Sequence, residues 1–163
     1  QELVGDGSWQ VVGIADADWA GVDRHDIRSI TGGIVKIGGI LVTSFARVQQ
    51  STSLSSAEAE LMALTAVAAE CLFWDGLLRE IGFGCERIPW CHCDSTAALG
   101  AAGRRGHKRM KHIELRKLVA QEWQKEGRIA FLKIPTEENE ADLLTKWVDL
   151  RTLRHLLCKA RVS

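Results

Sequence analysis

The sequence predicts a single α/β domain, in which a sheet of mixed strand directions is flanked by helices. Two observations lead to this fold class. Segments with strand and helix patterns follow one another in the order βββαβααβα, where the last α stands for two C-terminal helical segments, and no repeat or linker separates a second unit. The length of 163 residues and the hydrophobic content of 46% suit one domain with an ordinary core. We therefore expect residues 1–163 to form one domain, with about residues 1–10 as an N-terminal extension.

Three strands are expected in the first third of the chain, at residues 11–15, 31–37 and 40–47. The first is short and apolar and runs into Asp16. Gly38 and Gly39 join the second and third, and two such residues between β-rich runs are a standard signal for a tight hairpin. The segment between the first two strands is rich in glycine and charge, which predicts a loop.

One long helix is expected after this hairpin. Ser55 or Ser56 is a suitable N-cap, and Glu58 lies in the first turn, where the helix dipole favours an acid. Apolar residues then recur at helical spacing as far as Leu78, and Gly82 marks the end.

The second half of the chain predicts two further strands, at residues 87–93 and 129–134, and four helical segments, at residues 95–99, 109–125, 140–147 and 150–158. Pro89 interrupts the start of the first of these strands. Since proline cannot donate a hydrogen bond to a ladder, we expect this strand to lie at a sheet edge or to carry a bulge.

The composition indicates an intracellular protein. The five cysteines lack the spacing of a disulfide framework, and the chain has no signal peptide and no apolar run near the roughly 20 residues of a membrane span. Cys91-His92-Cys93 is similar to half of a zinc site, but no second ligand pair follows at the usual spacing, so buried strand cysteines are the preferred interpretation. Because the chain begins with Gln1, we expect it to be excised from a longer polyprotein.

Four acidic residues in separate sequence contexts stand out, namely Asp16, Glu60, Asp94 and Asp142. If a fold gathers them, their carboxylates repel one another unless cations neutralise them. Carboxylate oxygens are also the ligands that a hard ion such as Mg²⁺ prefers. The four acids therefore lead to the hypothesis of a divalent-metal site. As alternatives, Asp94 could be a simple helix N-cap, and Asp142 a solvated acid in the first turn of a helix.

Two neighbouring acids compete with members of this set. Asp18 lies two residues from Asp16 and could share its strand face, but its position is more typical of a loop entry. Glu58 and Glu60 are about 200° apart around a helix, so only one of them can face the sheet. Glu58 suits the helix dipole, which leaves Glu60 as the preferred site residue.

Basic residues are concentrated between residues 104 and 117, although the formal net charge is zero. The residues that we expect to bind nucleic acid are Ser95, Arg104, Arg105, Lys108, Arg109 and Lys111. Basic side chains there would release counterions from a nucleic acid and give a salt-sensitive affinity, and a solvated helix start is the alternative. His107 and His112 are interpreted as patch or structural residues. The tryptophans expected in the core rather than as base-stacking platforms are Trp19, Trp74, Trp90, Trp123 and Trp147.

Five stretches form an ordered set: Asp16-Ala17-Asp18-Trp19-Ala20-Gly21, Leu54-Ser55-Ser56-Ala57-Glu58-Ala59-Glu60, Cys93-Asp94-Ser95, Lys111-His112-Ile113-Glu114-Leu115-Arg116 and Ala141-Asp142-Leu143-Leu144-Thr145-Lys146. In this order and spacing they resemble the ribonuclease H domain of copia-type (Pseudoviridae) LTR retrotransposon Pol polyproteins. The resemblance runs from Gly13 to Leu157, nearly the whole chain. It implies a ribonuclease H-like fold with a five-stranded mixed sheet flanked by helices.

The resemblance also implies a function. Members of the family hydrolyse the RNA strand of RNA/DNA hybrids during reverse transcription, beside a reverse transcriptase domain in the same polyprotein. Their four catalytic, metal-binding acids map onto Asp16, Glu60, Asp94 and Asp142. The implied cofactors are two Mg²⁺ ions, with Mn²⁺ as a possible substitute. On this model Asp16 and Asp94 hold or bridge both ions, Glu60 supports the ion near the leaving group, and Asp142 the ion that carries the attacking water.

Two other functions are alternatives at this point. A domesticated or decayed copy would keep the fold and bind nucleic acid without cutting it, although the intact acids favour an enzyme. An integrase-like or resolvase-like DNA nuclease would share the fold, but it does not predict the Ser-Ser-Ala-Glu-Ala-Glu and Lys-His-Ile motifs.

Overall fold

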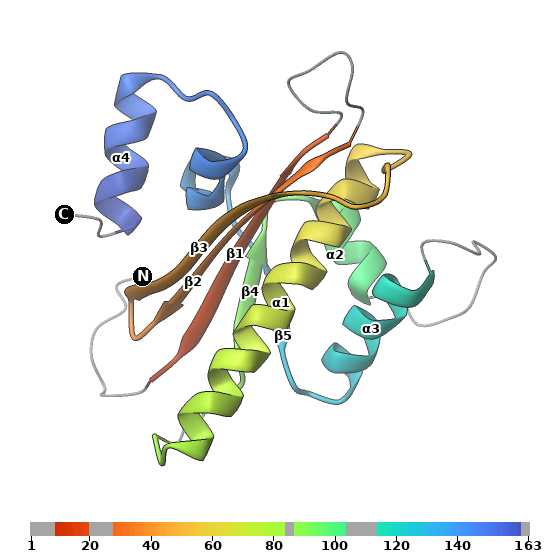
Figure 1. Ribbon diagram of the computed structural model, residues 1–163, viewed down its shortest axis with the longest axis vertical. Helices are drawn as coiled ribbons and strands as arrows, with labels where there is room; N and C mark the ends of the chain where they lie inside the picture. Colours follow the sequence, from red (N-terminus) through yellow and green to blue (C-terminus); the bar gives the residue numbers. More distant parts are fainter. Residues whose placement is uncertain (1–8, 20–27, 84–86, 104–113, 161–163) are drawn as a thin grey trace.

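The computed structural model describes residues 9–19, 28–83, 87–103 and 114–160, which form a five-stranded sheet with helices on both faces (Figure 1). The strands are β1 (Val11–Asp18), β2 (Ile30–Ile37), β3 (Ile40–Val48), β4 (Trp90–Cys93) and β5 (Ala130–Lys133). Their order in the sheet is β3-β2-β1-β4-β5. β2 is antiparallel to β1 and β3, whereas β1, β4 and β5 run parallel. The predicted α/β class and mixed five-stranded sheet are therefore confirmed.

β2 and β3 form the predicted hairpin. Ile37 pairs with Ile40, and the two residues between them, Gly38 and Gly39, have φ angles of 56° and 82°. Positive φ at both central positions is what a tight two-residue hairpin turn requires, and glycine adopts it at little cost.

β1 and β4 bring two of the predicted acids to the same end of the sheet. The strands are parallel, and Ala15 of β1 pairs with Cys93 of β4. The residues that follow this pair are Asp16 and Asp94. Because the carboxyl ends of parallel neighbours lie at one edge of a sheet, this register alone places the two acids side by side.

Pro89 neither puts β4 at an edge of the sheet nor gives it a bulge, since Trp90–Cys93 pairs in regular register on both sides, so that prediction is wrong. β4 lies between β1 and β5. The strand begins at Trp90, so the N–H that proline lacks lies before the ladder. The Pro89 carbonyl still accepts a hydrogen bond from the Ala130 N–H at 3.0 Å.

Three helices cover one face of the sheet (Figure 1), namely α1 (Ser56–Glu80), α2 (Thr96–Gly103) and α3 (Glu114–Lys125). Ser55 is the N-cap of α1, as predicted, and its side chain accepts a hydrogen bond from the Glu58 N–H at 3.2 Å. Gly13 allows α1 to approach β1 closely, because a Cβ there would lie 2.5 Å from the Cys71 Sγ.

The apolar character of α1 is greater than the sequence analysis expected. By length and composition this helix could cross a membrane, with a mean hydropathy of 1.6. Half of its most apolar window is buried, and residues such as Leu64, Val67 and Ala68 belong to the main core against the sheet. Its place as the central core helix accounts for its composition.

The opposite face of the sheet carries the C-terminal elements η1 (Thr136–Glu138), η2 (Glu140–Leu144) and α4 (Leu150–Ala160) (Figure 1). The predicted helix over residues 140–147 is thus a shorter 3₁₀ helix. Lys36 of β2 forms a buried ion pair with Glu140 at 2.6 Å and holds η2 against the sheet. Gly32 of β2 leaves room for this contact, because a Cβ there would lie 2.6 Å from the Thr145 Cγ2.

The prediction that five tryptophans belong to the core is correct only in part. Trp74 and Trp123 pack against the main core, and Trp90 is partly buried. In contrast, Trp19 and Trp147 are 48% and 94% exposed. Neither residue belongs to a helix or strand, because Trp19 directly follows β1 and Trp147 lies three residues beyond the end of η2.

Candidate metal centre

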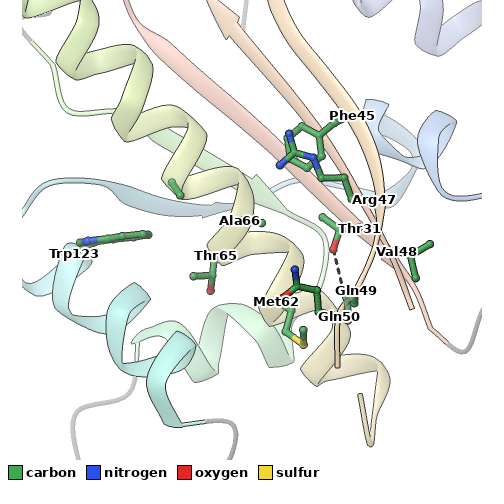
Figure 2. A pocket seen from close by; sticks show the side chains of 11 residues that line it. Thr31, Phe45, Arg47, Val48, Gln49, Gln50, Met62, Thr65, Ala66 and Trp123 are labelled. Atoms are coloured by element: carbon green, nitrogen blue, oxygen red, sulfur yellow. Dashed lines mark hydrogen bonds between the residues drawn. The ribbon is translucent and has the colours of Figure 1, made fainter. Parts of the chain in front are cut away.

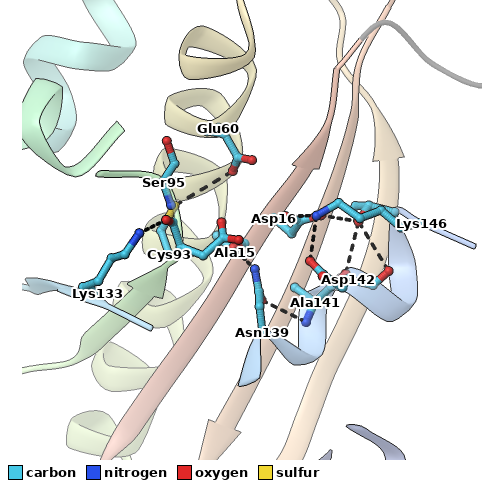
Figure 3. A network of polar contacts seen from close by, with 12 residues as sticks. Ala15, Asp16, Glu60, Cys93, Ser95, Lys133, Asn139, Ala141, Asp142 and Lys146 are labelled. Atoms are coloured by element: carbon cyan, nitrogen blue, oxygen red, sulfur yellow. Dashed lines mark hydrogen bonds and ion pairs between the residues drawn. The ribbon is translucent and has the colours of Figure 1, made fainter. Parts of the chain in front are cut away.

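The four predicted acids lie near one another at one end of the sheet. Figure 3 shows three of them, Asp16 of β1, Glu60 of α1 and Asp142 of η2. The fourth, Asp94, directly follows β4. Carboxylate oxygens of Asp16, Asp94 and Asp142 lie within 4.8 Å of one another. A second group within the same distance consists of Glu60, Cys93 and Asp94.

Asp94 belongs to both groups because of its place just past the end of β4. Asp16 lies opposite Gly32, and the face on which they lie carries η2 and Asp142. Glu60 instead approaches from α1, on the other face. A residue beyond the strand end can meet side chains from both faces, so the two groups form one continuous cluster.

Asp16 is fully buried and makes contacts through both carboxylate oxygens. The Thr145 hydroxyl donates a hydrogen bond to Oδ2, and the Lys146 ammonium lies 3.1 Å from Oδ1. The carboxylate thus has a fixed orientation in an otherwise apolar stretch of β1.

Asp142 owes its position to the buried side chain of Asn139. The Asn139 Nδ2 donates to the carbonyl oxygen of Ala15 at 3.3 Å, and its Oδ1 accepts from the Ala141 N–H at 3.2 Å. One side chain therefore links the start of η2 to the β1 residue directly before Asp16. Its removal would leave two buried backbone groups without these partners.

Burial and neighbouring acids shift two pKa values in the cluster. Burial, followed by repulsion from Asp16 and Asp94, raises the pKa of Glu60 from 4.5 to about 8. Burial also raises the pKa of Asp142, to about 6, and the hydrogen bond with Lys146 opposes this effect. Burial alone would lower the pKa of Lys146, but its interactions with Asp142 and Asp16 raise it. The cluster therefore has a deficit of positive charge that cations would relieve.

Cys93 is a neighbour of the cluster that the sequence analysis did not assign to it. Its Sγ lies 3.9 Å from the Glu60 Oε2. Burial raises the pKa of this thiol to about 12, so it is a neutral group and a poor metal ligand. Cys71 and Cys91 are also buried free thiols, which agrees with the interpretation of residues 91–93 as a buried strand.

The structure tests the alternatives for Asp94 and the two competing acids. Ser95 is the residue that caps α2, because its Oγ accepts from the Ala98 N–H at 3.2 Å, so Asp94 is not the cap. The Glu58 carboxylate accepts from the Leu54 N–H at 2.7 Å, as expected of a residue at the start of a helix. Asp18 belongs to neither metal-ligand group.

The basic residues predicted to bind nucleic acid lie outside the described part of the chain, namely Arg104, Arg105, Lys108, Arg109 and Lys111, as do His107 and His112. Ser95 lies beside the cluster, with its hydroxyl oxygen engaged in the helix cap. The nucleic-acid interface therefore stays a prediction.

A cavity of about 360 Å³ lies between β3, α1 and α3 and has no acidic residue in its lining (Figure 2). Met62 and Thr65 of α1 line it, together with Arg47 and Trp123. Met62 is about 200° from Glu60 around the helix, so this cavity opens away from the carboxylates. The acidic cluster, rather than this cavity, is the candidate site.

Sequence reasoning missed three residues that shape the site, Asn139, Thr145 and Lys146. The last two lie within the Ala141–Lys146 stretch that was singled out for Asp142 alone. The spacing of four between Asp142 and Lys146 is a signal that could have identified the ion pair, since such residues are neighbours on a helical turn.

Comparisons with known proteins identify homologous polyproteins and solved structures with a similar fold. No protein-family model matches the chain. It is 33% identical over 152 residues, 93% of its length, to the retrovirus-related Pol polyprotein from transposon TNT 1-94 of Nicotiana tabacum, and covers 11% of that protein. It is 30% identical over 150 residues, 91% of its length, to the corresponding polyprotein from transposon RE1 of Arabidopsis thaliana, and covers 10% of it. The chain thus spans about a tenth of the length of these curated relatives.

Solved structures with a similar fold include ribonucleases H. LC11-RNase H1, isolated from compost by a metagenomic approach, superposes with a TM-score of 0.62 at 15% identity, over 83% of this chain and 91% of that one. The N-terminal RNase H domain of a Mycobacterium tuberculosis protein superposes with a TM-score of 0.59 at 16% identity, over 94% of this chain and 99% of that one. The chain has the ribonuclease H fold, and over about 90% of its length it is homologous to one segment of the Pol polyproteins of copia-type retrotransposons.

Proposed function

We propose that this chain is a metal-dependent endonuclease that hydrolyses the RNA strand of RNA/DNA hybrids, as reverse transcription of a retroelement requires. The observation that carries the proposal is the convergence of Asp16, Asp94 and Asp142 within 4.8 Å, with Glu60 in a second group that shares Asp94. The fold supports it, because LC11-RNase H1, which has the same fold, has been solved in complex with an RNA/DNA hybrid.

The residues present fit divalent cations. Apart from the neutral thiol of Cys93, the two groups offer only carboxylates, which are hard oxygen ligands suited to Mg²⁺ and also to Mn²⁺. Two groups with one shared acid suggest two ions: Asp16, Asp94 and Asp142 would hold one, and Glu60 with Asp94 the other. Bound there, Mg²⁺ ions supply Lewis-acid stabilisation of the phosphate and activation of a water nucleophile.

The chain's own residues prepare the site for this chemistry. Thr145 fixes the Asp16 carboxylate by a hydrogen bond, and Asn139 holds η2 so that Asp142 faces β1. Glu60 carries a proton at neutral pH and must release it before its carboxylate can bind a cation. These residues therefore position the acids before the substrate arrives.

The partners follow from the same proposal. The substrate is an RNA/DNA hybrid, and the basic segment between residues 104 and 111 would contact its phosphates together with Ser95. Because the relatives are Pol polyproteins, we expect a reverse transcriptase domain in the same polyprotein and an intracellular setting.

The test is a cleavage assay with labelled RNA/DNA hybrid, double-stranded RNA and double-stranded DNA, in Mg²⁺ or in EDTA. We expect cleavage of the hybrid alone, in Mg²⁺ alone, and its loss in Asp94→Asn, because this acid belongs to both groups. Asp18→Asn is the matched control, since it removes an acid from the end of β1 that lies outside both groups. Cleavage by Asp94→Asn or in EDTA would refute the metal assignment. A folded wild type that binds hybrid without cutting it, also when joined to its polymerase neighbour, would identify the non-catalytic alternative.

A further inference from the structure

Lys146 forms ion pairs with two carboxylates of the cluster. Its Nζ lies 2.9 Å from the Asp142 Oδ1 and 3.1 Å from the Asp16 Oδ1, so the ammonium bridges an acid of η2 and an acid of β1 (Figure 3). In the described part of the chain, every ion pair to Asp16 or Asp142 comes from Lys146. The ammonium therefore holds the place of a cation between two of the three acids within 4.8 Å.

The contacts of Asp16 indicate which group must move when a divalent ion binds. In this structure Oδ1 faces Lys146 and Oδ2 accepts a hydrogen bond from Thr145. An ion bound to this carboxylate would displace one of these partners or compete with it. Thr145 is buried and packs over Gly32, so it has no room to withdraw. The Lys146 side chain is 39% exposed and has four rotatable carbon–carbon bonds, so it can turn into solvent.

We propose that Lys146 is a built-in counter-ion: it occupies the cation position of the ion-free site, holds Asp16 and Asp142 together, and leaves when a divalent cation binds. This inference rests on the metal site of the proposed function. It makes Lys146 a positioning residue, which prevents repulsion between the acids and sets the concentration at which cations fill the site. Removal of its charge then has two opposite effects, a weaker ion-free fold and tighter cation binding.

The first test measures Mg²⁺ binding by calorimetry and thermal unfolding in EDTA for wild type, Lys146→Met, Lys146→Arg and Lys125→Met. We expect Lys146→Met to bind Mg²⁺ about tenfold more tightly, because a competing charge near 3 Å is gone, and to unfold at a lower temperature in EDTA. Lys146→Arg keeps the charge and should stay near wild type. Lys125→Met removes one exposed charge at the end of α3 and should change neither quantity. Unchanged or weaker Mg²⁺ binding by folded Lys146→Met would overturn the proposal.

The second test uses the wild-type protein, so that it does not depend on the folding of a variant. Lysines are acylated briefly with an amine-reactive ester, with and without saturating Mg²⁺, and Lys146 is quantified by mass spectrometry against Lys125. We expect Mg²⁺ to raise the labelling of Lys146 severalfold, because the ammonium is released, and to leave Lys125 unchanged. Equal labelling of Lys146 in both conditions would contradict the displacement.

Neither readout depends on catalysis, so the two proposals can fail separately. A wild type that cleaves no hybrid, while Lys146→Met binds Mg²⁺ more tightly, would refute the nuclease and support the counter-ion. If the wild type cleaves hybrid in Mg²⁺ but Lys146→Met binds Mg²⁺ with the same affinity as the wild type, the nuclease is supported and the counter-ion is refuted.

Discussion

The carboxyl of Glu60 makes the ion-free protein sensitive to pH, and Glu60→Gln should remove this sensitivity. The folded-state pKa of about 8 lies above the ordinary value of 4.5, so between these pH values the folded state binds more protons than the unfolded state. The stabilising contribution is complete below pH 4.5 and is lost as the pH rises through about 8. Since a tenfold change in proton affinity corresponds to about 1.4 kcal/mol, the loss amounts to at most about 4–5 kcal/mol above pH 8.

The measurement is the free energy of unfolding by urea, in EDTA, from pH 5 to pH 9. The difference between wild type and Glu60→Gln cancels the titration of groups that both share. We expect the variant to gain stability relative to wild type as the pH rises, by a few kcal/mol over the whole range. Glu80→Gln is the matched control, because Glu80 is an exposed acid at the end of the same helix. A difference that stays constant with pH, or that falls as the pH rises, would refute the reasoning.

Three further predictions concern the support of the site. Asn139→Ala should lower the free energy of unfolding by about 2–4 kcal/mol, because two buried backbone groups lose their partners, and should also weaken Mg²⁺ binding measured by calorimetry. Gly32→Ala should lower the free energy of unfolding by about 1–3 kcal/mol, because its methyl group would collide with Thr145. Gly76→Ala in α1 meets open space and should raise the free energy of unfolding by about 0.5–1 kcal/mol. Urea unfolding measures both, and equal effects of the two variants would contradict this account. Mg²⁺ binding at pH 7 should release protons, chiefly from Glu60, so the calorimetric enthalpy should vary with the ionisation enthalpy of the buffer, and a buffer-independent enthalpy would contradict the protonated state.

The sequence allowed most of the sheet to be predicted, because strand signals here are local. Gly38 and Gly39 mark the hairpin by their own backbone preference, and Ser55 marks the start of α1 by its capping hydroxyl. Pro89 misled the prediction for β4, because a proline restricts only the strand residues that must donate. The position of a strand in the sheet depends on the whole fold, so a single residue of the strand does not predict it.

The acids of the site could be predicted from the sequence better than the residues that hold them in place. Its acids were recognisable because carboxylates in four separate motifs have a chemical reason to converge, and the structure brings them together. Lys146 could have been recognised from its spacing to Asp142, whereas the support from Asn139 was not recognisable, because this residue acts through a hydrogen bond to a carbonyl more than 100 residues away. Such a contact exists only once η2 lies on β1, and nothing in the residues around Asn139 requires it. Side chains that position a site are therefore harder to predict than those that bind the ligand.

In the absence of divalent ions, two different cations offset the negative charge of the carboxylates, and both lower the affinity for Mg²⁺. Lys146 supplies a cation to Asp16 and Asp142, and a proton neutralises Glu60. Both must leave before cations can occupy the two groups, so the affinity of the free domain for Mg²⁺ is reduced by the stability of these two arrangements. A hybrid phosphate adds oxygen ligands and negative charge to the same site, which favours cations over the ammonium and the proton together. Mg²⁺ should therefore bind more tightly in the presence of hybrid than in its absence, and by reciprocity the hybrid should bind more tightly in Mg²⁺.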